Sequence, residues 1–162
     1  MKEESYQLLI DKALRFLSFR SRSKYEVATK LKQFAIKKGI PEKIVQQVII
    51  DLEEKNLLND RDFILWWKEQ RDTFRPKGTR LLKMELRNKG VDSRLIDEVL
   101  EVSENPKTSE FELALSLAQK RVPKIAHLPV NKQKEKIGSL LARRGFKWEI
   151  IYKVIDTIIK KD

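Results

Sequence analysis

Histidine and cysteine, the side chains that most often act as catalytic bases, nucleophiles and zinc ligands, are almost absent from this chain. There is one histidine, His127, and no cysteine, so a metal site built on histidine or cysteine and a Ser-His-Asp arrangement both lack parts. The pattern G-x-x-x-x-G-K-[ST] is absent from the sequence, which argues against the usual form of nucleotide hydrolysis. Asp60 and Asp62 could bind a metal, but at the start of an expected helix they are better interpreted as a cap and a partner of the helix dipole. We therefore expect no catalytic residue, no metal and no cofactor, and a protein that acts by binding.

Basic side chains are the stronger candidates for function, because they gather in three segments. The chain has 35 lysines and arginines against 24 acidic residues, a net charge of +11. Residues 20–38 hold seven basic residues against one acidic, residues 74–94 seven against two, and residues 131–147 six against one. The pattern predicts a partner with an extended negative surface, such as nucleic acid or an acidic protein face. The alternative is a row of solvated helix faces.

The candidate contacts to this partner all lie in the three basic segments. They are Arg20, Arg22, Lys24, Lys30, Arg75, Lys77, Arg80, Lys83, Arg87, Lys132, Lys136, Arg143, Arg144 and Lys147. Aromatic rings can add base stacking to such a surface, and the candidates are Trp66, Trp67, Phe74 and Trp148. Trp66 and Trp67 are adjacent, about 100° apart on a helix, so both cannot point into one core. A role in the core or between modules is still the better interpretation of these rings.

The elements that must position these side chains form a repeat centred on three glycines. Gly39, Gly90 and Gly145 each follow a basic residue, precede an apolar one, and stand 51 and 55 residues apart. Apolar residues recur eight and four positions before each glycine, and five, six, nine and ten positions after it. These are helical spacings. A glycine between them is typical of a helix that ends in a left-handed residue, so each unit is expected to be a helix, a tight turn and a second helix.

A third amphipathic stretch precedes each helix pair. The expected helices cover residues 5–19, 60–74 and 109–122. Ser23 with Glu26 and Ser109 with Glu112 match the capping box, in which the two side chains satisfy free amides at a helix start. A loop is expected over residues 123–129, between two prolines, and no segment alternates in the manner of a strand.

The expected fold class is therefore all-α, with three tandem three-helix repeats forming an elongated, curved array. The predicted boundaries are residues 1–58, 59–105 and 106–162. A module of about 50 residues has a marginal core, so neighbouring modules are expected to stabilise one another. If the modules stack, their basic middle helices could form one interrupted track.

The composition also favours a cytoplasmic protein. Without cysteine, neither disulfides nor thiolate chemistry is available. No run of 18 apolar residues occurs, and the acidic start of the chain does not match a signal peptide.

In order and spacing, these motifs resemble the RecX family. The similarity is most specific in Leu57-Leu58-Asn59-Asp60 followed by Phe63, in Lys77-Gly78, and in Leu86-Arg87-Asn88-Lys89-Gly90-Val91. Leu140-Leu141-Ala142-Arg143-Arg144-Gly145-Phe146 is similar to the turn of the family's third unit, and Ser21-Arg22-Ser23-Lys24-Tyr25-Glu26 matches its opening only loosely. The resemblance runs from about Tyr6 to Ile158. Ala35 departs from it where a larger aliphatic residue is expected, and Phe34 is expected to take over that packing.

The resemblance implies a regulator that binds RecA, lying in the helical groove of the RecA–DNA filament. It would limit filament growth and so modulate the ATPase, recombinase and coprotease activities of RecA in DNA repair, homologous recombination and the SOS response. Besides RecA, we expect weak direct binding to DNA, no membrane partner, and a monomeric protein. The family has no motif-defined active site, so no catalytic residue is carried over.

Two alternatives remain open from the residues alone. The first is a helix-turn-helix protein that binds DNA directly as a transcription or chromatin factor, because a glycine turn joins two short helices. Its recognition helices would be residues 42–53 and 92–101, which are not basic. The second alternative is a scaffold for acidic proteins.

Overall fold

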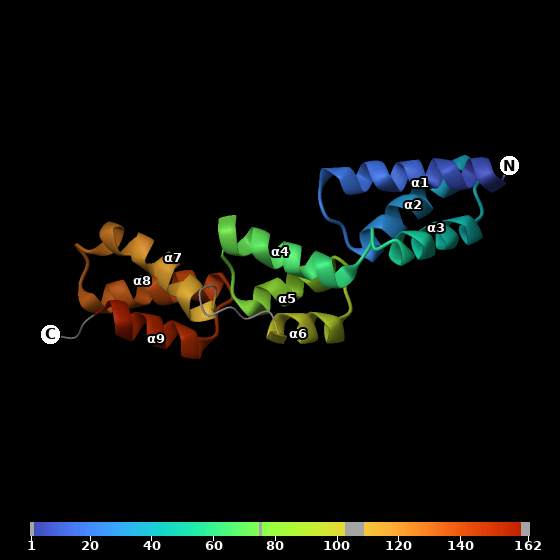
Figure 1. The fold of residues 1–162 in the computed structure, drawn as a ribbon. Coiled ribbons are helices and arrows are strands. Elements are labelled where there is room, and N and C mark those ends of the chain that lie inside the picture. Colours follow the sequence, from blue (N-terminus) through green and yellow to red (C-terminus); the bar gives the residue numbers. More distant parts are fainter. Residues whose placement is uncertain (1, 75, 103–108, 160–162) are drawn as a thin grey trace. The chain divides into compact units, whose positions relative to one another are not determined.

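The computed structural model describes residues 2–74, 76–102 and 109–159, which form helices joined by short connections and contain no strand (Figure 1). The expected all-α class is confirmed. The helices are α1 (Lys2–Phe19), α2 (Lys24–Lys38), α3 (Glu42–Glu54), α4 (Asp60–Phe74), α5 (Thr79–Asn88), α6 (Ser93–Val102), α7 (Glu110–Ile125), α8 (Val130–Arg143) and α9 (Trp148–Ile158). None of the described helices combines the length and apolar character needed to cross a bilayer.

The three glycine turns have the predicted conformation. The φ angles of Gly39, Gly90 and Gly145 are 68°, 80° and 84°, in the left-handed region. The next residue in each turn donates its amide N–H to the carbonyl five positions earlier: Ile40 at 2.8 Å, Val91 at 3.1 Å and Phe146 at 3.1 Å. These three apolar side chains are buried. Each turn therefore closes the preceding helix and inserts its apolar residue into a core.

Helix starts follow the capping signals in the sequence. Ser23 and Glu26 form the complete capping box at the start of α2. At the start of α7, the Ser109 hydroxyl accepts a hydrogen bond from the Glu112 amide at 3.2 Å. These contacts supply partners for amides that the helix itself leaves unpaired.

The expected loop over residues 123–129 is shorter than predicted. Helix α7 continues through Pro123 to Ile125, so the prediction is wrong for residues 123–125. A proline so near a helix end removes one backbone hydrogen bond in the last turn only. The extra turn also places Ile125 in the core, where it is 4% exposed, and this burial offsets the lost bond.

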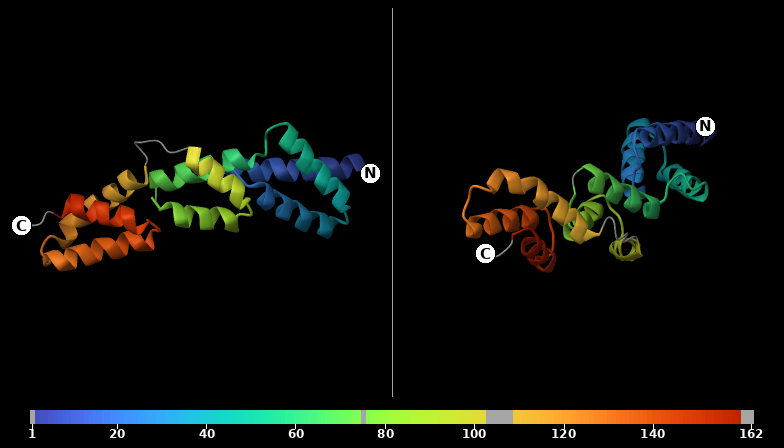
Figure 2. Two further views of the ribbon diagram at one scale, coloured as in Figure 1. Left: turned by 90° about the horizontal axis from the view of Figure 1, so that it is seen from below. Right: turned by 60° about the vertical axis from the view of Figure 1, so that its left-hand side comes forward.

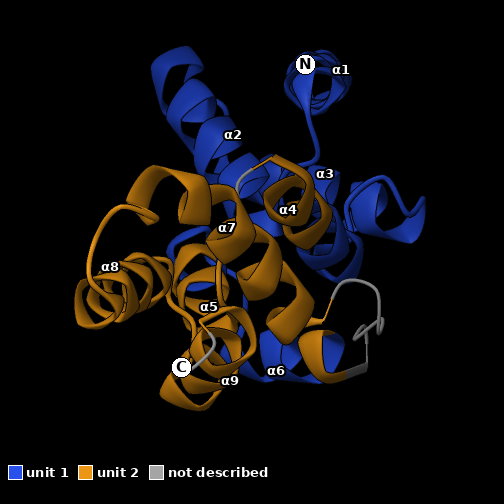
Figure 3. Ribbon diagram, turned by 90° about the vertical axis from the view of Figure 1, so that its left-hand side faces the viewer, with its two compact units in different colours: residues 1–66, 86–99 blue, residues 67–85, 100–162 orange. Residues whose placement is uncertain are grey.

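The chain divides into two compact units (Figure 3). The first comprises residues 1–66 and 86–99, and the second comprises residues 67–85 and 100–162. The division runs through α4, α5 and α6. The boundaries 1–58, 59–105 and 106–162 stay a prediction, and the boundary between residues 105 and 106 lies outside the described residues.

Each unit contains a three-helix bundle with its own hydrophobic core. In the first unit α1, α2 and α3 pack pairwise, and in the second α7, α8 and α9 do so, as the views of Figure 2 also show. Ala35 is buried in the first core and Phe34 packs against that core, which agrees with the expectation for this departure from the family pattern. Buried aliphatic side chains dominate both cores.

Candidate binding surface

In the first unit, the start of the basic helix α2 packs on the glycine turn that follows α5. Ser23 is fully buried, and its hydroxyl donates to the Lys89 carbonyl at 2.6 Å. The Tyr25 ring lies against Gly90, where an added Cβ would come within 2.2 Å of the ring. Both the left-handed backbone and this close approach therefore require glycine.

Asp60 completes this junction by capping α2. Its carboxylate accepts a hydrogen bond from the Lys24 amide at 2.8 Å. Burial raises the pKa of Asp60 above its ordinary value, and the hydrogen bond and charge of Lys24 oppose that shift. The sequence predicted that Asp60 caps a helix, and it does, but the helix is α2 and not α4, which Asp60 itself begins. At the start of α4 the side-chain oxygen of Asn59 accepts a hydrogen bond from the Asp62 amide. Among the described residues no group of three metal-binding side chains gathers.

The second unit repeats this junction between α5 and the turn after α8. The Gly78 amide donates to the Arg144 carbonyl at 2.7 Å. A Cβ on Gly78 would lie 2.3 Å from the Gly145 carbonyl oxygen, and one on Gly145 would lie 2.4 Å from Leu81. The Glu110 carboxylate accepts from the Thr79 amide at 3.0 Å, as Asp60 does from Lys24.

Both junctions thus place the start of a basic middle helix on the next glycine turn along the chain. In each junction, the residue before the middle helix (Ser23 or Gly78) donates a hydrogen bond to the backbone carbonyl of the residue before the turn glycine. The first residue of the following helix α4 or α7, Asp60 or Glu110, accepts a hydrogen bond from the first amide of that middle helix. Sequence reasoning did not find these pairings. A glycine or serine directly before a middle helix is the signal that could have suggested them.

Several candidate cations of the first segment are engaged within the protein. Arg20 forms an ion pair with Glu26 at 2.5 Å, and Lys24 forms one with Glu53 at 3.1 Å. The Arg22 guanidinium lies 3.9 Å from the centre of the Phe16 ring, and its side chain is 16% exposed. Burial holds the pKa of Arg22 below its usual value, with a smaller contribution from Arg20. Arg22 is therefore positioned to hold the α1–α2 connection.

Two candidates near α5 are also engaged, and one lies outside the described residues. Lys77 pairs with Glu85 at 3.2 Å, and Glu85 also binds Arg71 at 2.9 Å. Arg144 donates to the Pro76 carbonyl at 3.4 Å. Arg75 is the candidate outside the described part of the chain.

The remaining candidates are more accessible. Lys30, Arg80, Arg87, Lys136, Arg143 and Lys147 are exposed, and Lys83 is half-buried. Lys132 is exposed and lies 3.4 Å from Glu135 on the same helix. The accessible charge therefore comes from α2, α5, α8 and the start of α9.

The aromatic candidates separate into two pairs. Trp66 and Trp67 are half-buried, with Trp66 stacked on Phe63 and Trp67 beneath Arg71. Phe74 and Trp148 are 76% and 60% exposed. The prediction that these rings lie in a core is therefore wrong for Phe74 and Trp148. Both are at one end of a helix, where a ring can stand at a helical spacing from core residues and still point into solvent.

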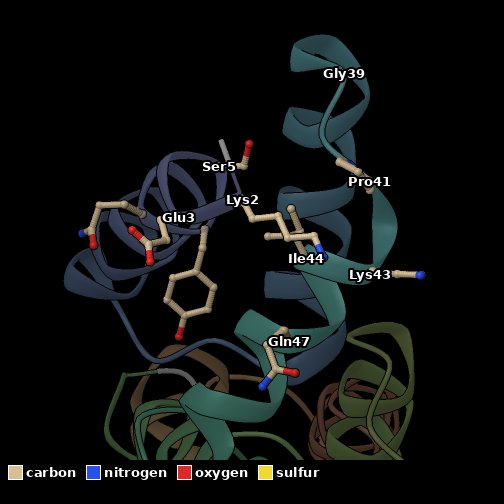
Figure 4. A pocket seen from close by; sticks show the side chains of 10 residues that line it. Lys2, Glu3, Ser5, Gly39, Pro41, Lys43, Ile44 and Gln47 are labelled. Carbon is tan, nitrogen blue, oxygen red and sulfur yellow. The ribbon is translucent and has the colours of Figure 1, made fainter.

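An open cavity of about 1010 Å³ borders the first glycine turn. Figure 4 shows its lining from the start of α1, including Glu3, and from the α2–α3 region, including Gly39 and Ile44. Tyr6 also lines it and donates its hydroxyl proton to Asp51. This hydrogen bond raises the pKa of Tyr6 and lowers that of Asp51.

Comparison with known proteins identifies the repeat. The models of the first, second and third three-helix domains of RecX match residues 10–52, 59–100 and 108–155. The chain belongs to the RecX family. This confirms the resemblance and the three tandem three-helix domains.

Individual RecX proteins are similar along most of the chain. The regulatory protein RecX of Staphylococcus saprophyticus is 30% identical over 158 residues, which cover 96% of this chain and 54% of that protein. The RecX of Chlorobaculum tepidum is 28% identical over 162 residues, covering 100% and 95%. The chain spans about half the length of several curated relatives, including those of Staphylococcus saprophyticus and Streptococcus agalactiae.

Solved structures agree with this fold. The crystal structure of RecX from Lactobacillus salivarius has a TM-score of 0.83 at 24% identity, covering 96% of this chain and 97% of that one. A second RecX crystal structure has a TM-score of 0.76 at 23% identity, covering 94% and 73%.

Proposed function

We propose that this RecX-family chain binds RecA and its filament on DNA, limits filament growth, and so modulates the ATPase, recombinase and coprotease activities of RecA. Membership of a family of regulatory proteins carries the proposal. The chain would act as a cytoplasmic monomer in DNA repair, homologous recombination and the SOS response.

The accessible cations support this proposal physically. Lys30, Arg87 and Lys136 are exposed on the middle helices α2, α5 and α8, and the Lys30 ammonium also lies 5.5 Å from the centre of the Phe16 ring. Exposed charges can attract an acidic protein surface or DNA phosphates over about 10 Å at 0.1 M salt. For each phosphate that a cation neutralises on duplex DNA, the logarithm of the binding constant would fall more steeply with the logarithm of the salt concentration, by about 0.9 in slope.

Direct sequence reading by a helix-turn-helix is the second candidate function, and the charge distribution counts against it. Helices that follow the glycine turns would be the recognition helices. Helix α3 has one lysine against four acidic residues, and α6 has one arginine against three. Such helices would repel phosphates when entering a groove.

The deciding experiment follows ATP hydrolysis by RecA on single-stranded DNA as the chain is added. Inhibition at far less than one chain per RecA supports filament regulation, whereas loss of activity only through competition for DNA favours the second candidate. The combined variant Lys30→Glu, Arg87→Glu, Lys136→Glu should inhibit at least tenfold less well. The combined variant Lys43→Glu, Lys120→Glu, Lys153→Glu reverses three exposed charges on α3, α7 and α9, so it is the matched control and should inhibit normally. Full inhibition by the triple variant would contradict the role of the middle helices.

A further inference from the structure

We propose that the cavity beside Trp148 binds one base of single-stranded DNA together with an adjoining phosphate. The proposal rests on the proposed function only for the choice of DNA as the nucleic acid. Binding itself would be a property of this chain, measurable without RecA.

The first observation is an exposed pair of aromatic rings on α9. Trp148 and Tyr152 are 60% and 61% exposed, and their ring centres are 5.9 Å apart at an interplanar angle of 31°. They stand four residues apart and so share one face of the helix, while Ile151 and Val154 are buried in the core. Large rings held in water beside one another provide a stacking platform that any unpaired base can use.

The second observation is the cavity that adjoins this platform. Its volume is about 610 Å³, and it is lined by Arg80, Ala142, Gly145, Phe146, Lys147, Trp148 and Glu149. This volume lies within the range of small-molecule sites. Gly145 and Phe146 are buried, whereas Trp148 is exposed at the rim.

Charge at the cavity favours a phosphate. Arg80 and Lys147 line it and are exposed, and Arg143 is exposed on the last turn of α8. Glu149 is the acidic residue of the lining. Cations therefore outnumber the carboxylate where the sugar-phosphate backbone of a stacked base would lie.

The junction within the second unit brings these groups together from distant parts of the chain. Arg80 is the second residue of α5, and the Gly78 amide binds the Arg144 carbonyl at 2.7 Å. The close backbone contact of Gly78 with Gly145 places the start of α5 against the α8–α9 turn. A cation and a ring that are separated by 68 residues in sequence thus line one cavity.

Single-stranded DNA fits this combination better than a duplex or a protein does. In a duplex the faces of the bases are already stacked, so an exposed ring finds no face to cover. An acidic protein could pair with Arg80 and Lys147, and contact with protein is therefore the competing outcome of the test.

The test titrates the full chain into a fluorescently labelled oligothymidylate of about 20 nucleotides and follows anisotropy, without RecA. Trp148→Ala should weaken binding about tenfold, as expected for loss of one stacked base, and Trp148→Phe should restore most of the affinity. Arg80→Gln should make the affinity less dependent on salt concentration, by the amount expected for the loss of roughly one phosphate contact. Phe19→Ala, which removes an exposed ring at the end of α1 that does not line the cavity, should bind as the wild type does. A duplex of the same length should bind with no dependence on Trp148.

The outcomes separate this proposal from the proposed function. If the wild-type chain inhibits RecA but Trp148→Ala leaves oligothymidylate binding unchanged, the proposal is overturned while the function stands. Loss of RecA inhibition in Trp148→Ala with unchanged DNA binding would assign the rings to a protein contact and would also overturn it. Tight, Trp148-dependent binding of the oligonucleotide with no effect on RecA would support the site and contradict the proposed function.

Discussion

The three glycine turns share a backbone conformation but differ in what packs on them. A Cβ on Gly90 would run into the Tyr25 ring, although Gly90 itself is exposed, and a Cβ on Gly145 would run into Leu81. A Cβ on Gly39 would meet none of the described residues within 4 Å, and this turn borders the open cavity of Figure 4.

A turn can require glycine for two physical reasons, a positive φ angle and a lack of space for a side chain, and the sequence does not distinguish them. At Gly39 the positive φ alone favours glycine. At Gly90 and Gly145 the neighbouring helix start also occupies the space of a side chain. The two covered turns therefore connect repeats, while the open turn only ends a helix.

The largest expected effect is at Gly78, where the obstacle is backbone. Gly78→Ala should lower the free energy of unfolding by about 3 kcal/mol or more, because the Gly145 carbonyl cannot rotate away as a side chain can. Urea denaturation followed by circular dichroism would measure it. Gly138→Ala is the control, since its Cβ would meet the Ile155 side chain at an ordinary 3.8 Å. An equal effect of the two variants would contradict the tight junction.

Gly90→Ala tests the covered turn of the first unit. We expect a loss of about 2–3 kcal/mol from left-handed strain and contact with the Tyr25 ring. In a Tyr25→Ala background the cost should fall to about 1 kcal/mol, because only the strain remains. A double-mutant cycle of unfolding free energies gives the coupling. Additive effects would show that the ring does not cover Gly90.

Ser23→Ala tests the hydrogen bond across the same junction. We expect a loss of about 1–2 kcal/mol, because the hydroxyl both caps α2 and satisfies the Lys89 carbonyl. Ser109→Ala removes a helix cap with the same geometry and should cost less in thermal unfolding. If Ser109→Ala proves the more costly change, the Lys89 contact contributes little.

Gly39→Ala should have the smallest effect. With open space around the position, we expect a cost of about 1 kcal/mol from the left-handed backbone alone. Gly39→Asn should recover part of it, since asparagine tolerates this conformation. The midpoint of urea denaturation for the three proteins measures this. A loss as large as that of Gly90→Ala would show that the first turn is also covered.

Much of the local structure followed from residue spacing. The left-handed glycines, the buried Ile40 and the capping box at Ser23 were all predictable, because they depend on residues within one or two helical turns of each other. Pro123 was misleading because the burial of Ile125, a tertiary effect, outweighed the local preference to end the helix.

The binding surface was less predictable, since charge in a sequence says nothing of its partners in space. Arg22 lies over a ring of the preceding helix, and Lys77 pairs with Glu85, so both are partly withdrawn from the surface. For Trp148 the sequence erred the other way, since it predicted a buried ring and the ring is exposed. Ile151 and Val154 form the buried face of α9, and Trp148 lies outside that face.

The amino-acid sequence alone determined the helices, their turns, the excess of positive charge and the membership of a repeat family, because these depend on short-range periodicity and composition. Only the tertiary structure decided which glycines are covered, which cations remain accessible, and that Arg80 meets Trp148 at one cavity. Contacts between residues 60 or more positions apart are set by packing, and packing leaves no regular spacing in the sequence.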